Sequence, residues 1–582
     1  MSANSAAGAG RGVRAWLAHS VSGPLLSEGQ FFFFLSILIG LFGGLSVVCF
    51  QLAIDSTRFW LLTSSLRPPA VRVLLAPTIA GLVVAFLVQR FFPRVRGSGV
   101  NQTKAAVFIF DGHIPFNTVI GKFVTCALGI GAGHSLGPED PSLQIGAGIA
   151  SALGRRMELS RDKLRLIAPV GAAAGLAAAF NSPISAVLFV IEEVIGNWSA
   201  GVLGAVVVSA VASVTVERWF RGDEPLFRIP LSHFGGVSDL PAYIVLGIAG
   251  GYFSVFFLKL VLTLRPRLKN LPQWTQYAQP AAAGLLIGLI GLGFPQVMGA
   301  GYGYMDQAMH DQFAWQLLLL LAVLKLVSTS LSFVSGTPGG LFAPTLFMGA
   351  MLGGAVGGFQ QHFFPFLHVA SVGPYALVGM GVLFAGILRA PMTSIFMIVE
   401  LTGDYSVIVP VMIANAIAYL ISRRNQKASL FDELSRQDGM NLPSMEERRE
   451  ERPLCTEDAM RGYSARVLAA TDTVKAAREA MQGTSESNLL VRGEFGWGIL
   501  PAAALDSGGG RAGDDSLIGP LCTKRGLPTL HPDEPLETAL RLIEDRPVLP
   551  VVMRSDHEHL RGVLGLQEVL QAYRRREEET ED

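Results

Sequence analysis

A carboxylate stands inside a long run of apolar and small residues and could do chemistry there. Glu139 belongs to Gly137–Pro141, which reads Gly-Pro-Glu-Asp-Pro. An ionisable group at membrane depth is costly, so it indicates an ion or proton path. The glycine and prolines predict a backbone break and a new helix with Pro141 in its first turn. The unpaired N–H groups and positive dipole end of such a helix attract an anion, and Glu139 can compete for that place.

The same pattern recurs further along the chain, which favours this interpretation over a capping acid in an ordinary loop. Gly340–Ala350 shares the frame G-x-x-x-P-S/T-L-x-x-G-A with Gly137–Ala147. A second set also repeats: Gly171, Pro183 and Glu192 correspond to Gly379, Pro391 and Glu400. The offsets are 203 (340 − 137) and 208 (391 − 183), so two halves follow one plan, in parallel or inverted orientation. Paired repeats are common in transporters, with the binding site between the halves.

The composition indicates a membrane protein. The 582 residues are 50% hydrophobic and only 16% charged, and the mean hydropathy is +0.42. Many apolar runs between Phe31 and Ile421 approach the roughly 20 residues that span a bilayer, and their interruption by Gly or Pro predicts discontinuous helices around a midplane site. The net charge is zero, so nothing suggests nucleic acid as a partner. The four cysteines are scattered, without metal-ligand spacing.

Changes in composition predict the domain boundaries. Residues 1–27 form a small, polar N-terminal segment, and the apolar runs place a membrane domain at 28–437. A charged linker at 438–453 precedes two units with alternating helix and strand patterns, 454–506 and 519–577, which a Gly-rich flexible joint at 507–518 connects. Lys and Arg crowd the loop around Arg155–Arg165 and follow the last apolar run. The N-terminus and the C-terminal units are therefore expected in the cytosol.

Taken together, these residues resemble the CLC family of chloride channels and chloride/proton exchangers, followed by a tandem pair of CBS domains. Three motifs occur in the order of the family: Gly97–Gly99, Gly137–Pro141 and Gly340–Pro344. The resemblance implies an all-α polytopic membrane domain of two inverted repeats and a soluble α/β CBS pair. It also implies a homodimer in the cell membrane, with chloride and protons as partners and no enzymatic activity.

The resemblance assigns roles to single residues. The Ser98 hydroxyl, Gly99 and the backbone N–H groups of Leu341 and Phe342 would hold the central anion, and Gly340 would let the backbone approach it. Glu139 would be the gating glutamate, which occupies the anion's place when deprotonated and leaves it when protonated. The alternatives are a helix-capping role for Ser98 and simple packing for Phe342.

Glu193 bears on the choice between exchanger and channel. It ends Phe189–Glu193, which resembles the family segment with the internal proton acceptor, a Glu in exchangers and apolar in many channels. Adjacent Glu192 and Glu193 on a helix cannot face the same way. Glu193 is therefore expected on the proton path, together with Glu139, and Glu192 against a structural partner. The alternative is two solvated acids at a helix end.

Three residues depart from the family pattern. Asn101 stands where Pro is usual, and Asp140 stands where Gly is usual, which places a second acid beside Glu139. The anion-coordinating Tyr of the family aligns with Phe431, which has no hydroxyl. The central anion would then lose one donor, and proton coupling or selectivity would be looser.

These features predict secondary-active chloride/proton antiport. A passive voltage- or proton-gated chloride channel is the alternative within the same fold. A magnesium channel with CBS domains would need membrane-depth carboxylates without helix starts aimed at them. A membrane-embedded hydrolase would need a nucleophile with its base or a metal cluster, and the ten His include no His-x-x-x-His. Ser98 disfavours a fluoride exporter.

The CBS pair carries a weaker signal for a ligand. Such pairs often hold adenine nucleotides through an acidic residue in each unit. Here only Glu568 stands near the expected place, and the first unit offers no acid there. A coupling module without ligand is an equal alternative, and no metal or other cofactor is expected.

Overall fold

The computed structural model describes residues 28–63, 70–196, 200–227, 240–364, 371–440, 442–444, 454–482, 484, 486–506, 513–543, 546–554 and 556–581. The predicted N-terminal segment 1–27, most of the charged linker and the start of the Gly-rich joint lie outside the described residues. The chain divides into two compact units, Met1–Glu450 and Glu451–Asp582.

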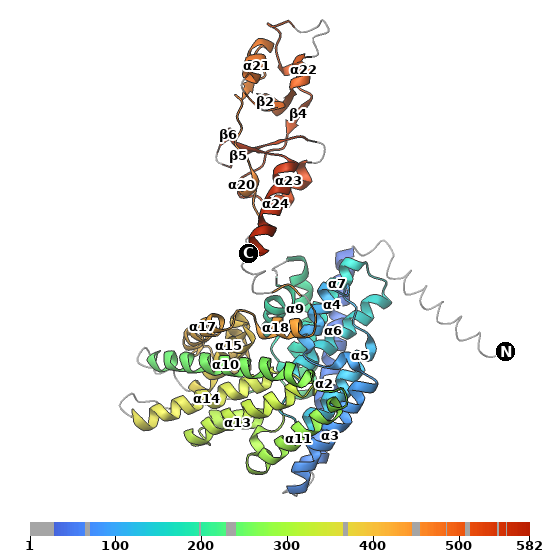
Figure 1. Cartoon of the computed structure of the whole chain (residues 1–582), viewed down its shortest axis with the longest axis vertical. Helices are drawn as coiled ribbons and strands as arrows, with labels where there is room; N and C mark the ends of the chain where they lie inside the picture. Colours follow the sequence, from blue (N-terminus) through green and yellow to red (C-terminus); the bar gives the residue numbers. More distant parts are fainter. Residues whose placement is uncertain are drawn as a thin grey trace, which may run out of the picture. The chain divides into compact units, whose positions relative to one another are not determined.

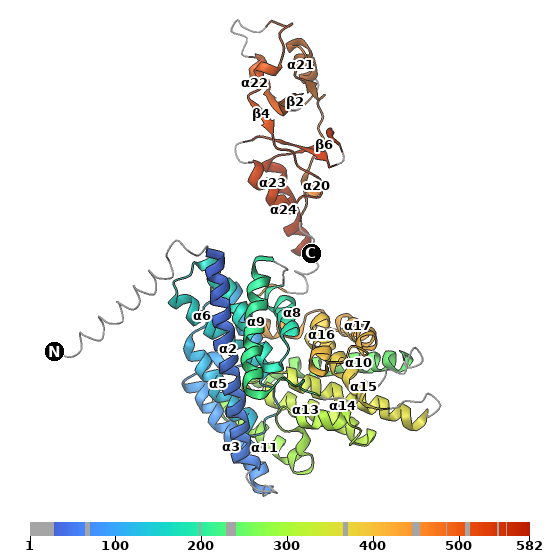
Figure 2. The ribbon, with the colours of Figure 1, turned by 180° about the vertical axis from the view of Figure 1, so that it is seen from behind.

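Helices build the first unit, and the Gly and Pro breaks in the sequence separate them (Figures 1 and 2). Pro183 and Pro391 each begin a helix, because proline suits the first helical position. The first half contains α2 (Glu28–Arg58), α3 (Ala70–Arg90), α4 (Gly99–Phe108), α5 (Phe116–Gly131), α6 (Glu139–Arg156), α7 (Arg161–Phe180), α8 (Pro183–Phe189) and α9 (Ala200–Arg221). The second contains α10 (Leu240–Lys269), α11 (Thr275–Gly293), α12 (Tyr302–Met309), α13 (Trp315–Val334), α14 (Phe342–Phe363), α15 (Gly373–Leu388), α16 (Pro391–Thr402) and α17 (Ile408–Asn425), and α18 (Leu430–Gln437) follows.

The two halves repeat one packing scheme, as the sequence predicts. In the first half α2 packs against α9, which Figure 2 shows side by side, and α6 packs against α7. In the second half α10 packs against α17 and α14 against α15. An antiparallel bridge between Gly137 and Gly340 brings the starts of α6 and α14 together. The predicted fold class of the membrane domain is therefore confirmed.

The surface of the first unit suits a lipid environment. Within the described residues, seven helices are long and apolar enough to cross a bilayer. Large apolar side chains such as Phe42, Phe86 and Leu289 are about half exposed on the helices. Exposed apolar area of this extent is unusual in soluble proteins. The chain is a membrane protein.

Within its described residues, the second unit combines short helices with two small sheets, so its predicted α/β class is confirmed. Its helices are α20 (Thr456–Ala459), α21 (Val474–Met481), α22 (Ala502–Asp506), α23 (Leu536–Ile543) and α24 (Leu566–Glu581). One sheet has the order β1 (Leu468–Ala469), β2 (Asn488–Gly493), β3 (Gly496–Pro501) and β4 (Lys524–Leu527), and the other joins β5 (Leu549–Met553) to β6 (Asp556–Leu564).

The two parts of this unit interlock across the predicted joint at 507–518. Strand β4 follows the joint but pairs with β3, which precedes it. In the other direction, Arg461 exchanges backbone hydrogen bonds with Val563 of β6. The Arg461 guanidinium also donates to Glu486 and to Glu568 (Nε–Oε1 2.8 Å), and its hydrogen bond lowers the pKa of Glu486. The two parts therefore form one interlocked unit.

Candidate functional site

Two helix starts face each other at the junction of the repeats. Gly137 and Gly340 donate their backbone N–H groups to each other's carbonyls, both at 2.8 Å. Helix α6 begins two residues after Gly137, and α14 begins two residues after Gly340. A Cβ atom at Gly340 would lie 2.6 Å from the Cβ of Asp140. Glycine is therefore needed for the two starts to come this close.

The Glu139 carboxylate lies at the start of α14. Its side chain is fully buried, and Oε2 accepts a hydrogen bond from the backbone N–H of Ala343 at 3.3 Å. Ala343 is in the first turn of α14, where N–H groups have no intrahelical acceptor and the dipole end is positive. Glu139 thus occupies a position in which a small anion would be stabilised.

A cluster of aromatic rings forms around Phe342, the first residue of α14. The Phe342 ring lies edge-on to Phe189 with centroids 4.9 Å apart, stacks on Phe180 at 6.2 Å, and lies 6.4 Å from Phe431. Phe431 is fully buried. The structure therefore brings Phe342 and Phe431 together, and the residue at the predicted tyrosine position contributes an apolar ring without a hydroxyl.

Ser98 and Gly99 form a third helix start, that of α4. The Ser98 hydroxyl donates to Asp140 Oδ2 at 2.8 Å, and the backbone N–H of Gly99 donates to the other carboxylate oxygen. Ser98 Oγ also accepts the N–H of Val100 at 3.1 Å, so Ser98 caps the helix. In this arrangement the donors at Ser98 and Gly99 are directed at a carboxylate of the chain itself.

Glu193 belongs to a buried cluster of three charges. The Lys104 ammonium donates to Glu193 Oε1 at 2.9 Å and to Asp432 Oδ1 at 3.0 Å. Lys104 lies on α4, Glu193 follows α8, and Asp432 lies on α18 next to Phe431. All three side chains are at most 5% exposed. The cluster therefore ties the predicted proton acceptor to the elements that carry Ser98 and Phe431.

Asn101 adds a second bond between α4 and α18. Its side-chain amide donates to the backbone carbonyl of Phe431 at 3.0 Å. A proline, which the family has at this position, could not make this contact. The departure at Asn101 therefore fixes the segment that carries Phe431.

Glu192 faces away from Glu193 and caps α16. Its carboxylate accepts hydrogen bonds from the N–H of Met392 at 3.2 Å, and from the N–H and hydroxyl of Thr393 at 2.9 and 2.6 Å. Its repeat equivalent, Glu400, accepts the N–H groups of Ile184 and Ser185 at the start of α8. Each half thus supplies a carboxylate that caps a helix of the other half.

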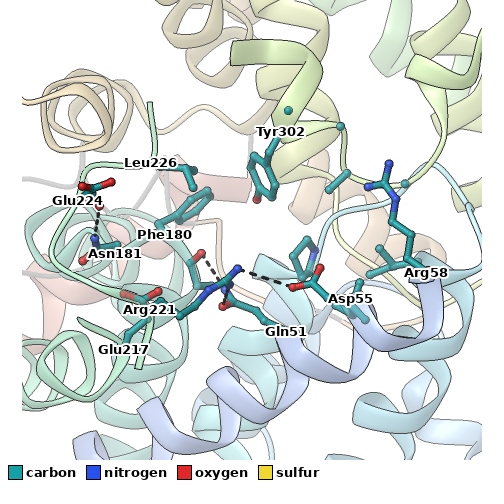
Figure 3. Close-up of a pocket in the computed structure, with 18 of the residues that line it drawn as sticks. Gln51, Asp55, Arg58, Phe180, Asn181, Glu217, Arg221, Glu224, Leu226 and Tyr302 are labelled. Carbon is teal, nitrogen blue, oxygen red and sulfur yellow. Dashed lines mark hydrogen bonds and ion pairs between the residues drawn. The ribbon is translucent and has the colours of Figure 1, made fainter. Parts of the chain in front are cut away.

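A pocket of about 440 Å³ reaches the turn before Glu139 (Figure 3). Pro138 and Phe180 line it on the side of the phenylalanine cluster, together with Tyr302. Charged side chains also line the pocket: Figure 3 shows Arg221 reaching from α9 to Gln51 and Asp55 on α2. Arg58, Glu217 and Glu224 also line it. The pocket therefore reaches the residue that precedes Glu139 in the chain.

Sequence reasoning missed two buried lysines that repeat with the offset of the motifs (325 − 122 = 203). Lys122 donates to the carbonyls of Val95 and Gly97, at 3.2 and 2.8 Å. Lys325 donates to those of Val297 and Gly299, at 3.1 and 2.6 Å. Both lysines stand within apolar runs. An ionisable group at membrane depth is costly, and this argument, which singled out Glu139, could have singled out the lysines as well.

In the second unit, Glu568 already accepts hydrogen bonds from the chain itself. Its carboxylate accepts hydrogen bonds from Arg461 Nε at 2.8 Å and from the N–H of Gly565 at 3.1 Å. A nucleotide hydroxyl would have to share or replace these donors. Within the described residues, no group of three or more His, Cys, Asp and Glu side chains could hold a metal ion.

The fold and the site define a class: polytopic membrane proteins built of two repeats, in which helix starts inside the membrane unit meet buried carboxylates. Comparison with known proteins gives the family. The family model described as voltage gated chloride channel matches residues 79–423, and the CBS domain model matches 519–575. The chain belongs to the voltage gated chloride channel (CLC) family.

Individual relatives agree with this assignment. The chain is 31% identical over 405 residues to an H(+)/Cl(-) exchange transporter ClcA of Vibrio cholerae. The aligned region covers 67% of this chain and 86% of the relative. It is 32% identical over 409 residues to an H(+)/Cl(-) exchange transporter ClcA of Salmonella schwarzengrund, with coverages of 67% and 85%.

Solved structures share the fold. A slow cyanobacterial Cl-/H+ antiporter matches with a TM-score of 0.65 and 24% identity, over 71% of this chain and 98% of the other. A eukaryotic CLC transporter matches with a TM-score of 0.60 and 19% identity, over 92% of this chain and 97% of the other. At these identities the likeness shows the fold alone.

Proposed function

We propose that this chain is a secondary-active chloride/proton antiporter with Glu139 as the gating glutamate. The observation that carries the proposal is the buried Glu139 carboxylate on the Ala343 N–H. A deprotonated Glu139 is attracted to the positive end of α14 and excludes a second anion from it. Protonation removes that charge, so the carboxyl leaves and chloride takes its place. One side chain thereby links the two ions.

The anion would be held by groups from both repeats. The backbone N–H groups of Leu341 and Phe342 lie beside the Ala343 N–H at the start of α14, and Gly340 gives them room. Ser98 and Gly99 contribute the start of α4, and Phe431 closes the site with an apolar ring. The pocket at Pro138 would supply the approach from one side.

Glu193 is the proposed internal proton acceptor. It is buried, it lies in the helical segment Val190–Ile195 that follows α8, and the adjacent Glu192 is occupied as a helix cap. A proton arriving at Glu193 would weaken its ion pair with Lys104, and a proton leaving would restore it. The relatives named H(+)/Cl(-) exchange transporters support proton coupling in this chain.

The proposal also includes the domain organisation, the oligomeric state and the membrane orientation of the chain. Residues 28–437 form the membrane domain, and 454–506 with 519–577 form a CBS pair joined through 507–518. Two copies form a homodimer in the cell membrane, each with its own pathway. The basic loops place the N-terminus and the CBS pair in the cytosol.

A passive chloride channel is the second candidate, and two observations favour it. The Lys104 ammonium pairs with Glu193, so this carboxylate already neutralises a buried charge of the structure. Phe431 offers no hydroxyl to the anion, which would loosen the link between anion and proton occupancy.

Purified protein in liposomes separates the two candidates. With high chloride inside and low chloride outside, an antiporter moves protons inward as chloride leaves, so the external pH rises. A proton ionophore should abolish the pH change. Chloride efflux without any external pH change would contradict the antiporter and support the channel.

A further inference from the structure

Asp140 holds the start of α4 in the way that a bound anion would. The Ser98 hydroxyl and the N–H groups of Gly99 and Val100 all donate to its carboxylate, Ser98 at 2.8 Å and Val100 at 3.1 Å. Asp140 is fully buried. These contacts connect residues about 40 positions apart in the chain, so they hold together two helices of the site rather than a single turn.

Helix α6 thus supplies a carboxylate to each of two other helix starts. Glu139 and Asp140 are its first two residues, and neighbouring helical side chains point about 100° apart. Glu139 reaches the start of α14, whereas Asp140 reaches the start of α4. The Lys122 ammonium lies behind the α4 start, on the carbonyls of Val95 and Gly97, and its charge acts on Asp140.

The Ser98 hydroxyl has a single proton to donate. While that proton points to Asp140, Ser98 cannot donate it to chloride. A negative carboxylate at this place also repels a second anion. The family has glycine where Asp140 stands. Glycine has no carboxylate to accept the Ser98 proton or to repel chloride.

We infer that Asp140 is a second carboxylate gate, which competes with chloride for the Ser98 hydroxyl and the start of α4. The inference rests on the proposed function, since it concerns the same anion site. Chloride gains its full set of donors only when both Glu139 and Asp140 have moved aside. The wild-type chain therefore binds chloride more weakly than a chain with glycine at this position.

Isothermal titration of chloride into the full-length protein, purified in chloride-free buffer, tests the inference. Asp140→Gly should lower the chloride Kd roughly tenfold, the effect of one hydrogen bond to a charged partner. Asp140→Asn, which keeps the shape and removes the charge, should also lower it. If Asp140 only capped α4, both variants would bind chloride no better than wild type, and the inference would be overturned.

A double-mutant cycle with Ser98→Ala makes the test specific. Ser98→Ala should weaken chloride binding at least several-fold more in the Asp140→Gly background than in the wild-type background, because only there is the hydroxyl released to the anion. Equal losses in both backgrounds would contradict the inference and leave the proposed function intact. Absence of chloride binding in wild type and in every variant would instead refute the proposed function.

Discussion

The ammonium of Lys104 holds two buried carboxylates at once. Glu193 and Asp432 come from different elements and both accept a hydrogen bond from this side chain. Taking three charges out of water is costly, and their mutual attraction offsets that cost only while all partners are present. The cluster therefore makes the position of Glu193 depend on a residue 89 positions away.

Replacing Lys104 should destabilise the protein strongly. Lys104→Met removes the ammonium that pairs with the buried carboxylates of Glu193 and Asp432, and breaking a buried pair in this way costs about 3–5 kcal/mol. The matched control is Lys259→Met, because Lys259 is exposed on α10. Thermal unfolding of both variants in the same detergent measures the difference. Equal melting temperatures would mean that the cluster contributes nothing to stability.

At the scale of helices, the site depends on how closely three helix starts approach one another. The Gly137–Gly340 pairing fixes the distance between α6 and α14, and the Asp140 carboxylate fixes α6 against α4. None of these contacts involves a large side chain. Backbone geometry therefore sets the dimensions of the site.

A single methyl group at the junction should disturb it. In Gly340→Ala the new Cβ would lie 2.6 Å from the Asp140 Cβ and 3.0 Å from the Gly137 carbonyl oxygen. Relieving this overlap should cost about 1–3 kcal/mol and weaken chloride binding. Gly204→Ala on α9 is the control, because a Cβ there meets no described atom within 4 Å. A Gly340→Ala variant with the stability and chloride affinity of Gly204→Ala would show that the junction tolerates the methyl.

The sequence predicted the helix starts because their signals are local. Glycine and proline mark where α6 and α14 begin, and the repeated frame shows that the two starts are equivalent. The same local logic located Glu139 and placed Glu192 and Glu193 on different faces of a helix. The class of protein and its internal repeat were therefore predictable from the sequence.

The partners of these residues were not predictable, because they depend on long-range packing. The sequence could show that Asp140 and Asn101 were unusual, but not that Asp140 accepts from Ser98 or that Asn101 donates to Phe431. Lys104 and Asp432 are 328 positions apart, and no spacing rule connects them. For the same reason, the sequence did not predict that strand β4, which follows the joint of the CBS unit, pairs with β3, which precedes it.

At the scale of the whole molecule, the site exists only when both repeats are folded. Ser98, Glu139 and Asp140 come from the first half, Ala343 and Phe342 from the second, and Phe431 from α18 after both. A carboxylate of one half lies at a helix start of the other. Coupled transport is therefore expected to be a property of the complete membrane unit rather than of either repeat.

Proton coupling in a Glu139→Gln variant tests this account most directly. Glutamine has nearly the same shape but cannot carry a negative charge or exchange a proton. In liposomes with an outward chloride gradient, the variant should still release chloride, while the accompanying proton influx should fall to the level of protein-free liposomes. Chloride release in the same vesicles controls for folding. A Glu139→Gln variant that still drives protons against their gradient would contradict the account.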